Sequence, residues 1–180
     1  FIAPGNHDLD RNDLYLVPCA ISQPLKSEIE VQEWLTNDRK RSKLLEPFRP
    51  FSNFVESFTG HKQADFAHIH RVKVGDRDIA VLCMNSSWMC GRKNDSGVIN
   101  DKDFVLVGEP QILFPLSERS NADLKIAVLH HPFDWLAEFD RNRIERRLMQ
   151  ECNFVLRGHQ HKPQIDVIHS TLGDCIIIPA

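Results

Sequence analysis

Three short segments, IAPGNHD, IAVLHHP and FVLRGHQH, each place polar side chains directly after a run of apolar residues. Imidazole is the commonest ligand of transition metals in proteins and titrates near neutral pH. An amide oxygen can join it at a metal, and a carboxylate can orient it. The side chains that offer this chemistry are Asn6, His7, Asp8, His130, His131, His159 and His161. The sequence therefore predicts metal binding, acid–base chemistry or both at the ends of these segments.

The apolar stretches in front of these side chains are expected to be buried strands. They cover residues 1–3, 124–129 and 153–157. In layered α/β folds, sites form where strands end and loops converge on one edge of the sheet. Gly5 and Gly158 let the chain turn tightly at that edge. Three such strand ends on one edge would bring the polar side chains into a single pocket.

His7 stands between a candidate ligand and a carboxylate. The oxygen of Asn6 is an unusual ligand and suits Mn²⁺, Fe²⁺ or Zn²⁺. Asp8 can hold a neighbouring imidazole in one tautomer and favour its protonated form. We therefore expect His7 to be an acid beside a metal, not a ligand.

The remaining pattern predicts helices and hairpins around these segments. Helices are expected over residues 25–36 and 140–151, the latter with Asp140 as its N-cap. A further helical stretch surrounds Pro47 and Pro50, which break it into pieces before it ends near Gly60. Its apolar face would carry Phe48, Phe51, Phe54, Val55 and Phe58.

Strand pairs are expected on both sides of the middle of the chain. Residues 67–74 and 78–85 predict a hairpin, and a second hairpin turns around residues 172–174. A short helix broken at Pro115 is expected over residues 109–119. Between these elements, residues 86–103 predict a polar loop.

Composition places the chain among ordinary soluble domains. It has 180 residues, 42% hydrophobic and 26% charged, with a formal net charge of −3. These values predict one domain, give no sign of nucleic-acid binding, and indicate no membrane span. The five cysteines form no C-x-x-C pair, and we expect Cys83, Cys152 and Cys175 to be buried apolar residues in a cytoplasmic protein.

The GNHD, HHP and GHxH segments, in this order and each after a strand, resemble three of the five motif blocks of the calcineurin-like metallophosphoesterase family. The resemblance spans residues 4–161. It implies an α/β fold, a four-layer α-β-β-α sandwich of two mixed sheets with outer helices.

The resemblance also implies a ligand set for two divalent metal ions, Mn²⁺, Fe²⁺ or Zn²⁺. Asn6, His130 and His159 would bind one ion, and His161 would bind the other. The first histidine of the HHP block is the ligand in the family, so His131 would line the pocket or support its neighbours.

A catalytic pair follows from the same resemblance. His7 would stabilise the transition state and protonate the leaving oxygen, and Asp8 would orient His7. The implied reaction is hydrolysis of a phosphomonoester or phosphodiester by a hydroxide that the two metals activate.

Two blocks of the family, D-x-H and G-D-x-x-D, do not occur in these residues. They would supply the carboxylates of the dinuclear site. We therefore expect residues 1–180 to be the C-terminal portion of a single metallophosphoesterase domain, completed by a preceding segment of the same polypeptide. The chain by itself is expected to bind metal weakly and to be inactive.

Other functions stay open at this point. A non-catalytic binding or regulatory module with the same fold is the main alternative, and a single structural zinc site is another. The substrate is expected to be a phosphate ester, with nucleic acid possible but not indicated and no membrane partner. Ser86 and Trp88 follow a buried strand and would lie near the pocket or in the core.

Overall fold

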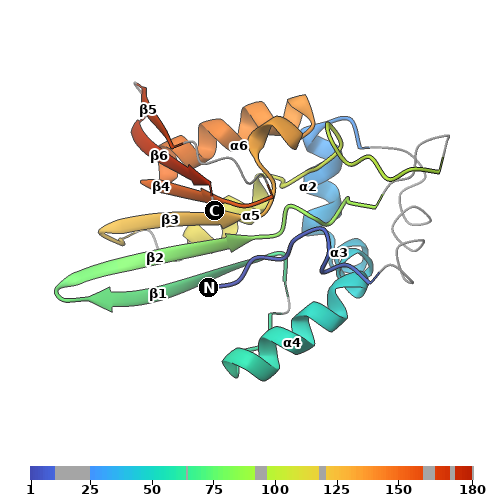
Figure 1. Cartoon of the computed structure of the whole chain (residues 1–180), viewed down its shortest axis with the longest axis horizontal. Coiled ribbons are helices and arrows are strands. Elements are labelled where there is room, and N and C mark those ends of the chain that lie inside the picture. The colour runs from blue at the N-terminus through green and yellow to red at the C-terminus, as the bar shows by residue number, and fades with distance from the viewer. Residues whose placement is uncertain are drawn as a thin grey trace.

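Six strands form one mixed sheet in the order β1-β2-β3-β4-β6-β5 (Figure 1). This computed structural model describes residues 1–10, 25–63, 65–91, 97–117, 121–159, 165–170 and 173–179. The strands are β1 (Ala67–Val74), β2 (Arg77–Met84), β3 (Leu124–Leu129), β4 (Phe154–Arg157), β5 (Asp166–Ser170) and β6 (Gly173–Pro179). β2, β3, β4 and β6 run parallel, and the two edge strands are antiparallel to their neighbours.

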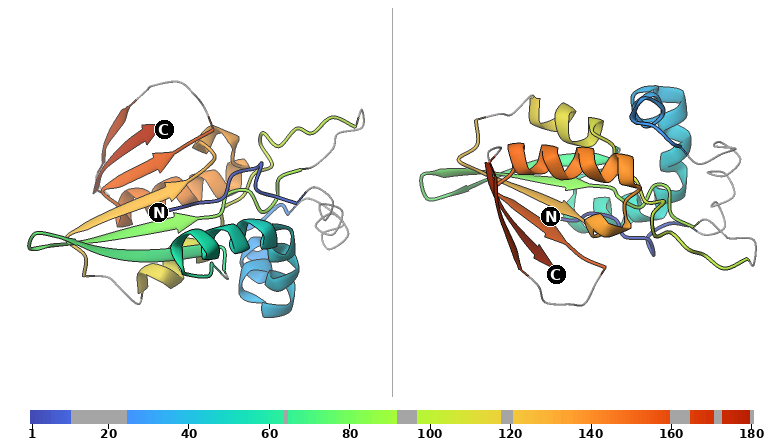
Figure 2. Two further views of the ribbon diagram at one scale, coloured as in Figure 1. Left: turned by 60° about the horizontal axis from the view of Figure 1, so that its bottom comes forward. Right: turned by 90° about the horizontal axis from the view of Figure 1, so that it is seen from above.

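Helices connect and cover the sheet. They are α2 (Glu28–Thr36), α3 (Asp38–Leu45), η1 (Glu46–Phe48), α4 (Arg49–Thr59), α5 (Pro110–Ser117), η2 (Phe133–Trp135) and α6 (Glu138–Glu151). α5 and α6 lie on one face of the sheet, and the N-terminal segment crosses the other (Figure 2). None of the helices in the described ranges is long and apolar enough to cross a bilayer.

The core lies between the sheet and the helices α5 and α6. Buried residues of the parallel strands, such as Leu82 and Leu129, belong to the same apolar cluster as Ile112 of α5 and Leu148 of α6. Parallel strands need crossover connections, and these helices both make the connection and bury the sheet face. The cluster holds the central strands, and therefore their carboxyl ends, in fixed positions.

Most of the expected elements are confirmed. The two hairpins form as β1–β2 and β5–β6, and the helix over residues 25–36 starts one residue after Ser27. Ser27 and Glu30 make a reciprocal capping box at that start. Pro47 lies in the 3₁₀ turn η1, and α4 ends at Gly60, whose φ of 73° is the left-handed conformation common at helix ends.

The mixed α/β class is confirmed, while the layer arrangement stays a prediction. The strands in the described part of the chain form a single sheet. The second sheet of the four-layer sandwich therefore remains an expectation from the family resemblance. Of the cysteines, Cys83, Cys152 and Cys175 are buried and free, as expected, and Cys19 lies outside the described residues.

The expected strand at residues 1–3 is wrong, because no ladder pairs this segment and Phe1 is 65% exposed. Side-chain contacts to the backbone hold it instead. The Gln63 amide donates to the Ile2 carbonyl at 3.2 Å, and the Ser87 hydroxyl donates to the Pro4 carbonyl at 3.3 Å. The segment thus still reaches the end of β2 without joining the sheet.

Two details of the helices also differ from expectation. α5 continues through Pro115, which lies only two residues before its end, so few hydrogen bonds are lost. On α4, Phe51 and Val55 are buried, but Phe54 and Phe58 are exposed and stack on each other with centroids 5.9 Å apart. The buried face of α4 therefore includes fewer aromatic residues than the sequence predicted.

Asp140 is not the N-cap of α6. The helix begins at Glu138 with Ala137 as N-cap, and Asp140 lies in the first turn, 2% exposed. Its carboxylate accepts hydrogen bonds from the backbone N–H groups of Val107 (2.6 Å) and Gly108 (3.1 Å). Asp140 therefore ties α6 to the loop before α5, a long-range contact that no local capping pattern reveals.

Replacing Asp140 with alanine is expected to lower the free energy of unfolding by about 3 kcal/mol at pH 5, because two buried N–H groups lose their acceptor. Urea unfolding measures this value. Glu138→Ala is the matched control, since Glu138 lies exposed in the same helical turn. Equal effects of the two substitutions would contradict the assigned role.

The effect of Asp140→Ala should shrink as the pH rises. Burial raises the pKa of Asp140 to about 6, outweighing the two N–H donors that favour the ionised form. The folded protein then keeps a proton that the unfolded chain has released, so this stabilisation is full at low pH and is lost as pH rises through 6. Between pH 5 and pH 8 the difference from the wild type should fall by about 1–1.5 kcal/mol.

Candidate metal centre

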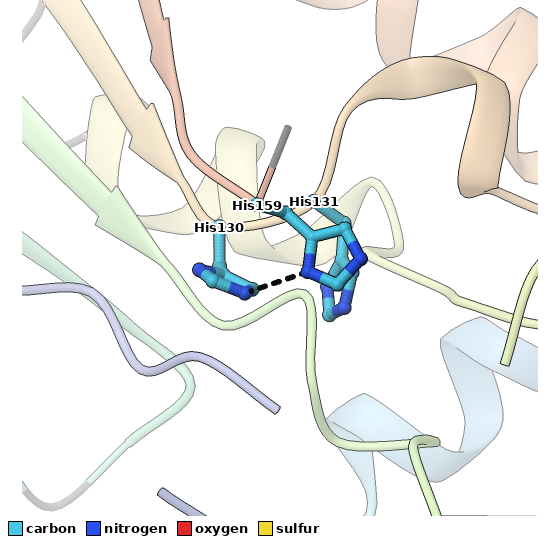
Figure 3. Close-up of side chains that lie close together, drawn as sticks. All are labelled: His130, His131 and His159. Carbon is cyan, nitrogen blue, oxygen red and sulfur yellow. Dashed lines mark hydrogen bonds between the residues drawn. The ribbon is translucent and has the colours of Figure 1, made fainter. Parts of the chain in front are cut away.

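The carboxyl ends of β3 and β4 bring two histidines together. His130 follows β3 directly, and His159 comes two residues after β4. The two strands are parallel neighbours, with Leu129 paired to Arg157 at their ends. Figure 3 shows the two imidazoles facing each other at this edge of the sheet, with a third histidine, His131, beside them.

Two potential metal-ligand atoms lie close to a third one, Nε2 of His130. Its Nε2 lies 3.1 Å from Nδ1 of His159 and 3.1 Å from Oδ1 of Asn6. The rings of His130 and His159 are nearly perpendicular, with centroids 5.0 Å apart. Asn6 arrives from the N-terminal segment, 124 residues away in sequence.

Each of these two separations is the one expected between two ligand atoms of the same cation. Two donors that each lie about 2.0–2.1 Å from the same ion are separated from each other by about 3.0–3.4 Å. Nε2 of His130 also faces both an amide oxygen and a second imidazole nitrogen, and one proton cannot satisfy both. Burial and the neighbouring His159 lower the pKa of His130, which leaves it neutral and able to offer a lone pair.

The backbone around the donors is constrained. His159 has a φ of 69°, a left-handed conformation that is uncommon for residues other than glycine and that often marks functional sites. Gly5 packs directly against the His130 ring, and a Cβ built there would lie 3.0 Å from the ring atoms Cε1 and Nδ1. The close approach of the N-terminal segment therefore requires glycine at position 5.

Gly5→Ala is expected to weaken metal binding about tenfold, because the His130 ring must move by a few tenths of an ångström and leaves its donor position. Isothermal titration with Mn²⁺ measures the affinity. Gly158→Ala is the matched control, since a Cβ there meets the same ring at 3.4 Å, an ordinary contact. Similar losses in both variants would rule out the steric explanation.

The turn after Gly5 is held by Asp8. Its carboxylate accepts from the Gly5 backbone N–H at 2.8 Å, and its own N–H donates to the Gly5 carbonyl at 3.1 Å. Leu9 is buried, and the N–H of Asp10 donates to the Pro47 carbonyl at 2.8 Å. The turn is therefore anchored on both sides, and it presents Asn6 to His130.

The other predicted site residues lie in different surroundings. His7 and Asp8 are exposed in the turn that carries Asn6. The orientation of His7 by Asp8 stays a prediction. His161 lies outside the described residues, so its role as ligand of a second ion also stays a prediction.

His131 is fully buried behind the converging donors. Its Nδ1 lies 2.9 Å from the Ser86 hydroxyl, and its Nε2 lies 3.7 Å from the Cys90 sulfur. Burial, together with His130 and His159, lowers the pKa of His131 to about 3. One nitrogen from each of the three histidines lies within 4.8 Å of the others, so spacing alone would also permit a three-imidazole site.

Trp135 contributes a contact that the sequence did not reveal. Its ring meets the His159 ring edge-on, with centroids 4.1 Å apart, and stacks on His131 at 5.9 Å. An aromatic residue five positions after His130 carries no spacing signal of its own. Trp88, in contrast, is a core residue that packs against Phe66.

Comparison with known proteins identifies the family. The model of the calcineurin-like phosphoesterase family matches residues 1–163. No curated protein matches the chain. Among solved structures, the chain is similar to a hypothetical protein from Thermus thermophilus, with 18% identity and a TM-score of 0.38, over 62% of this chain and 37% of that chain. The match over residues 1–163 shows that this chain belongs to the calcineurin-like phosphoesterase family.

Proposed function

We propose that this chain forms the later part of a domain that hydrolyses phosphate esters with two divalent metal ions, Mn²⁺, Fe²⁺ or Zn²⁺. The observation that carries the proposal is the convergence of Asn6 Oδ1 and His159 Nδ1 on His130 Nε2, each at 3.1 Å, in a member of this family. The substrate is a phosphomonoester or a phosphodiester.

The proposed metal ligands are divided between two ions. Asn6, His130 and His159 hold one ion, and His161 holds the other. Two bound divalent ions would supply an activated water and charge neutralisation for in-line displacement at phosphorus. The imidazole and amide ligands would set the position of the first ion, and the ends of β3 and β4 hold the two imidazoles in place.

His7 would move the proton in this reaction. It is exposed next to Asn6, so it can approach the leaving oxygen of a bound ester. A protonated imidazole there would neutralise the developing charge and donate its proton to that oxygen. Asp8 would orient His7, in addition to holding the turn through the Gly5 N–H.

The carboxylates of the site would come from elsewhere in the polypeptide. None of the proposed ligands is a carboxylate, and the D-x-H and G-D-x-x-D blocks do not occur in the sequence. Two dications held by neutral ligands alone would repel each other with little compensation. We therefore propose that a preceding segment supplies these blocks, and that residues 1–180 alone bind metal weakly and do not turn over.

The lack of carboxylate ligands also favours a second candidate, a non-catalytic module that keeps the fold for binding or regulation. The two proposals differ in what the polypeptide does when the preceding segment is present. An enzyme hydrolyses esters in a metal-dependent manner. A module binds its partner without turnover.

The deciding experiment is a hydrolysis assay on the polypeptide with its preceding segment, using p-nitrophenyl phosphate and bis(p-nitrophenyl) phosphate with Mn²⁺. We expect turnover of at least one substrate, lost on chelation and restored by Mn²⁺. Residues 1–180 alone serve as the comparison and should be inactive. Bound metal without turnover of either ester would favour the module.

A further inference from the structure

His131 has both of its ring nitrogens occupied by protein groups. It is fully buried, with Nδ1 2.9 Å from the Ser86 hydroxyl and Nε2 3.7 Å from the Cys90 sulfur. Ser86 follows β2 by two residues and His131 follows β3 by two residues, so the ends of two neighbouring parallel strands meet in this arrangement. Neither nitrogen is left facing open space at the candidate metal centre.

Two side chains hold the ring of His131 on opposite edges. The Ser86 hydroxyl oxygen accepts from the His131 backbone N–H at 3.1 Å and also lies 2.9 Å from Nδ1, so Ser86 contacts both the backbone and the ring. The Cys90 sulfur lies 3.7 Å from Nε2 on the other edge of the ring. Both ring nitrogens therefore have a protein group within hydrogen-bond distance.

The ring of His131 also forms a wall behind His159. It lies 4.9 Å from the His159 ring and 4.8 Å from the His130 ring, measured between centroids. Trp135 closes the other side, stacked on His131 and edge-on to His159. His159, whose backbone adopts φ 69°, is therefore held in place by packing against two fixed rings.

We propose that His131 is a positioning residue: Ser86 and Cys90 hold its ring, which keeps both ring nitrogens out of the metal's coordination and fixes the ring of His159 against Trp135. This inference rests on the proposed function, because it assigns the metal to Asn6, His130 and His159. The inference favours a site with two imidazoles and one amide over a site with three imidazoles, which the spacing of His130, His131 and His159 would also permit.

Nitrogen-15 NMR of the histidine rings, in the polypeptide with its preceding segment, tests the coordination directly. On titration with Zn²⁺, signals of His130 Nε2 and His159 Nδ1 should shift, and those of His131 should stay. Coordination shifts at His131 would overturn this inference while leaving a metal centre. Unchanged signals at His130 and His159 would instead overturn the proposed function, and this inference with it.

Substitutions test the positioning role. Ser86→Ala and His131→Leu are each expected to weaken Co²⁺ binding about tenfold, as loss of groups that orient metal ligands does. His131→Asn keeps a polar atom near the position of Nδ1 and should restore most of the affinity. The Co²⁺ absorption spectrum should change in the first two variants and return toward that of the wild type in the third.

Ser57→Ala is the matched control, since Ser57 donates one hydrogen bond to the Phe54 carbonyl within α4, away from the metal centre. Thermal unfolding checks that each variant is folded. If Ser86→Ala behaves like Ser57→Ala, or if His131→Leu and His131→Asn bind Co²⁺ equally well, His131 does not position the ligands. The NMR measurement on the unsubstituted protein decides whether His131 coordinates the metal even if a variant fails to fold.

Discussion

In the polypeptide with its preceding segment, replacing His130 with alanine is expected to lower the affinity for Mn²⁺ by more than about 100-fold, because losing a ligand should cost more than the 10–100-fold loss seen for groups that only orient ligands. Phosphoester hydrolysis should fall to the background rate. Nε2 of His130 is the atom that both Asn6 and His159 approach at 3.1 Å, so its removal leaves two donors without their shared centre. Titration calorimetry and metal analysis of the purified protein measure the affinity.

The matched control is His169→Ala. His169 is an exposed histidine of β5 that contacts Asp174 on the neighbouring strand, away from the metal centre. It should bind Mn²⁺ like the wild type. If the His130→Ala variant keeps its metal content, the first ion does not bind at this edge of the sheet, and the proposed assignment of Asn6 and His159 is wrong.

The second large effect is expected from His7→Ala. In the polypeptide with its preceding segment, kcat should fall by about 10²–10³-fold with metal content unchanged, because a general acid and a charge-stabilising group are lost together. The loss should be smaller for an aryl ester such as p-nitrophenyl phosphate, whose leaving group needs little protonation, than for an alkyl ester. Comparing kcat for the two esters isolates the proton transfer from metal binding.

Two further variants separate the roles in this turn. His61→Ala replaces an exposed histidine after α4 and should leave kcat unchanged. Asp8→Asn keeps an acceptor for the Gly5 N–H but loses the charge beside His7. If Asp8 only holds the turn, Asp8→Asn will behave like the wild type; a fall in kcat at constant metal content supports its action on His7. A His7→Ala variant as active as the wild type would contradict the assigned acid.

The parts of the fold that were predicted correctly are those with local signals. The β1–β2 hairpin follows from two strand-like runs on either side of the Gly75–Asp76 turn, and the end of α4 follows from Gly60. The parallel strands β3 and β4 follow from short apolar runs that end in polar residues. In each case, the turn residue or the run of apolar side chains acts within a few positions of the element that it determines.

The incorrect predictions concern residues whose contacts lie far away in the sequence. Asp140 accepts hydrogen bonds from the backbone N–H groups of Val107 and Gly108, more than 30 residues away. A capping rule that considers only the helix of Asp140 therefore predicts the wrong role for it. Residues 1–3 have the composition of a strand, but they are held by Gln63 and Ser87 rather than by a ladder. Contacts with distant partners decided both outcomes.

The sequence by itself determined which side chains are the candidate metal ligands, because Asn6, His130 and His159 each follow a turn-forming or strand-ending segment whose type is readable locally. Only the tertiary structure decided that Asn6 and His159 approach His130 Nε2 at 3.1 Å, and that His131 faces Ser86 and Cys90. The reason is physical. Adjacent residues of one chain diverge at a strand end, and which of two neighbouring histidines faces the opening depends on the packing of strands and loops that lie far apart in the sequence.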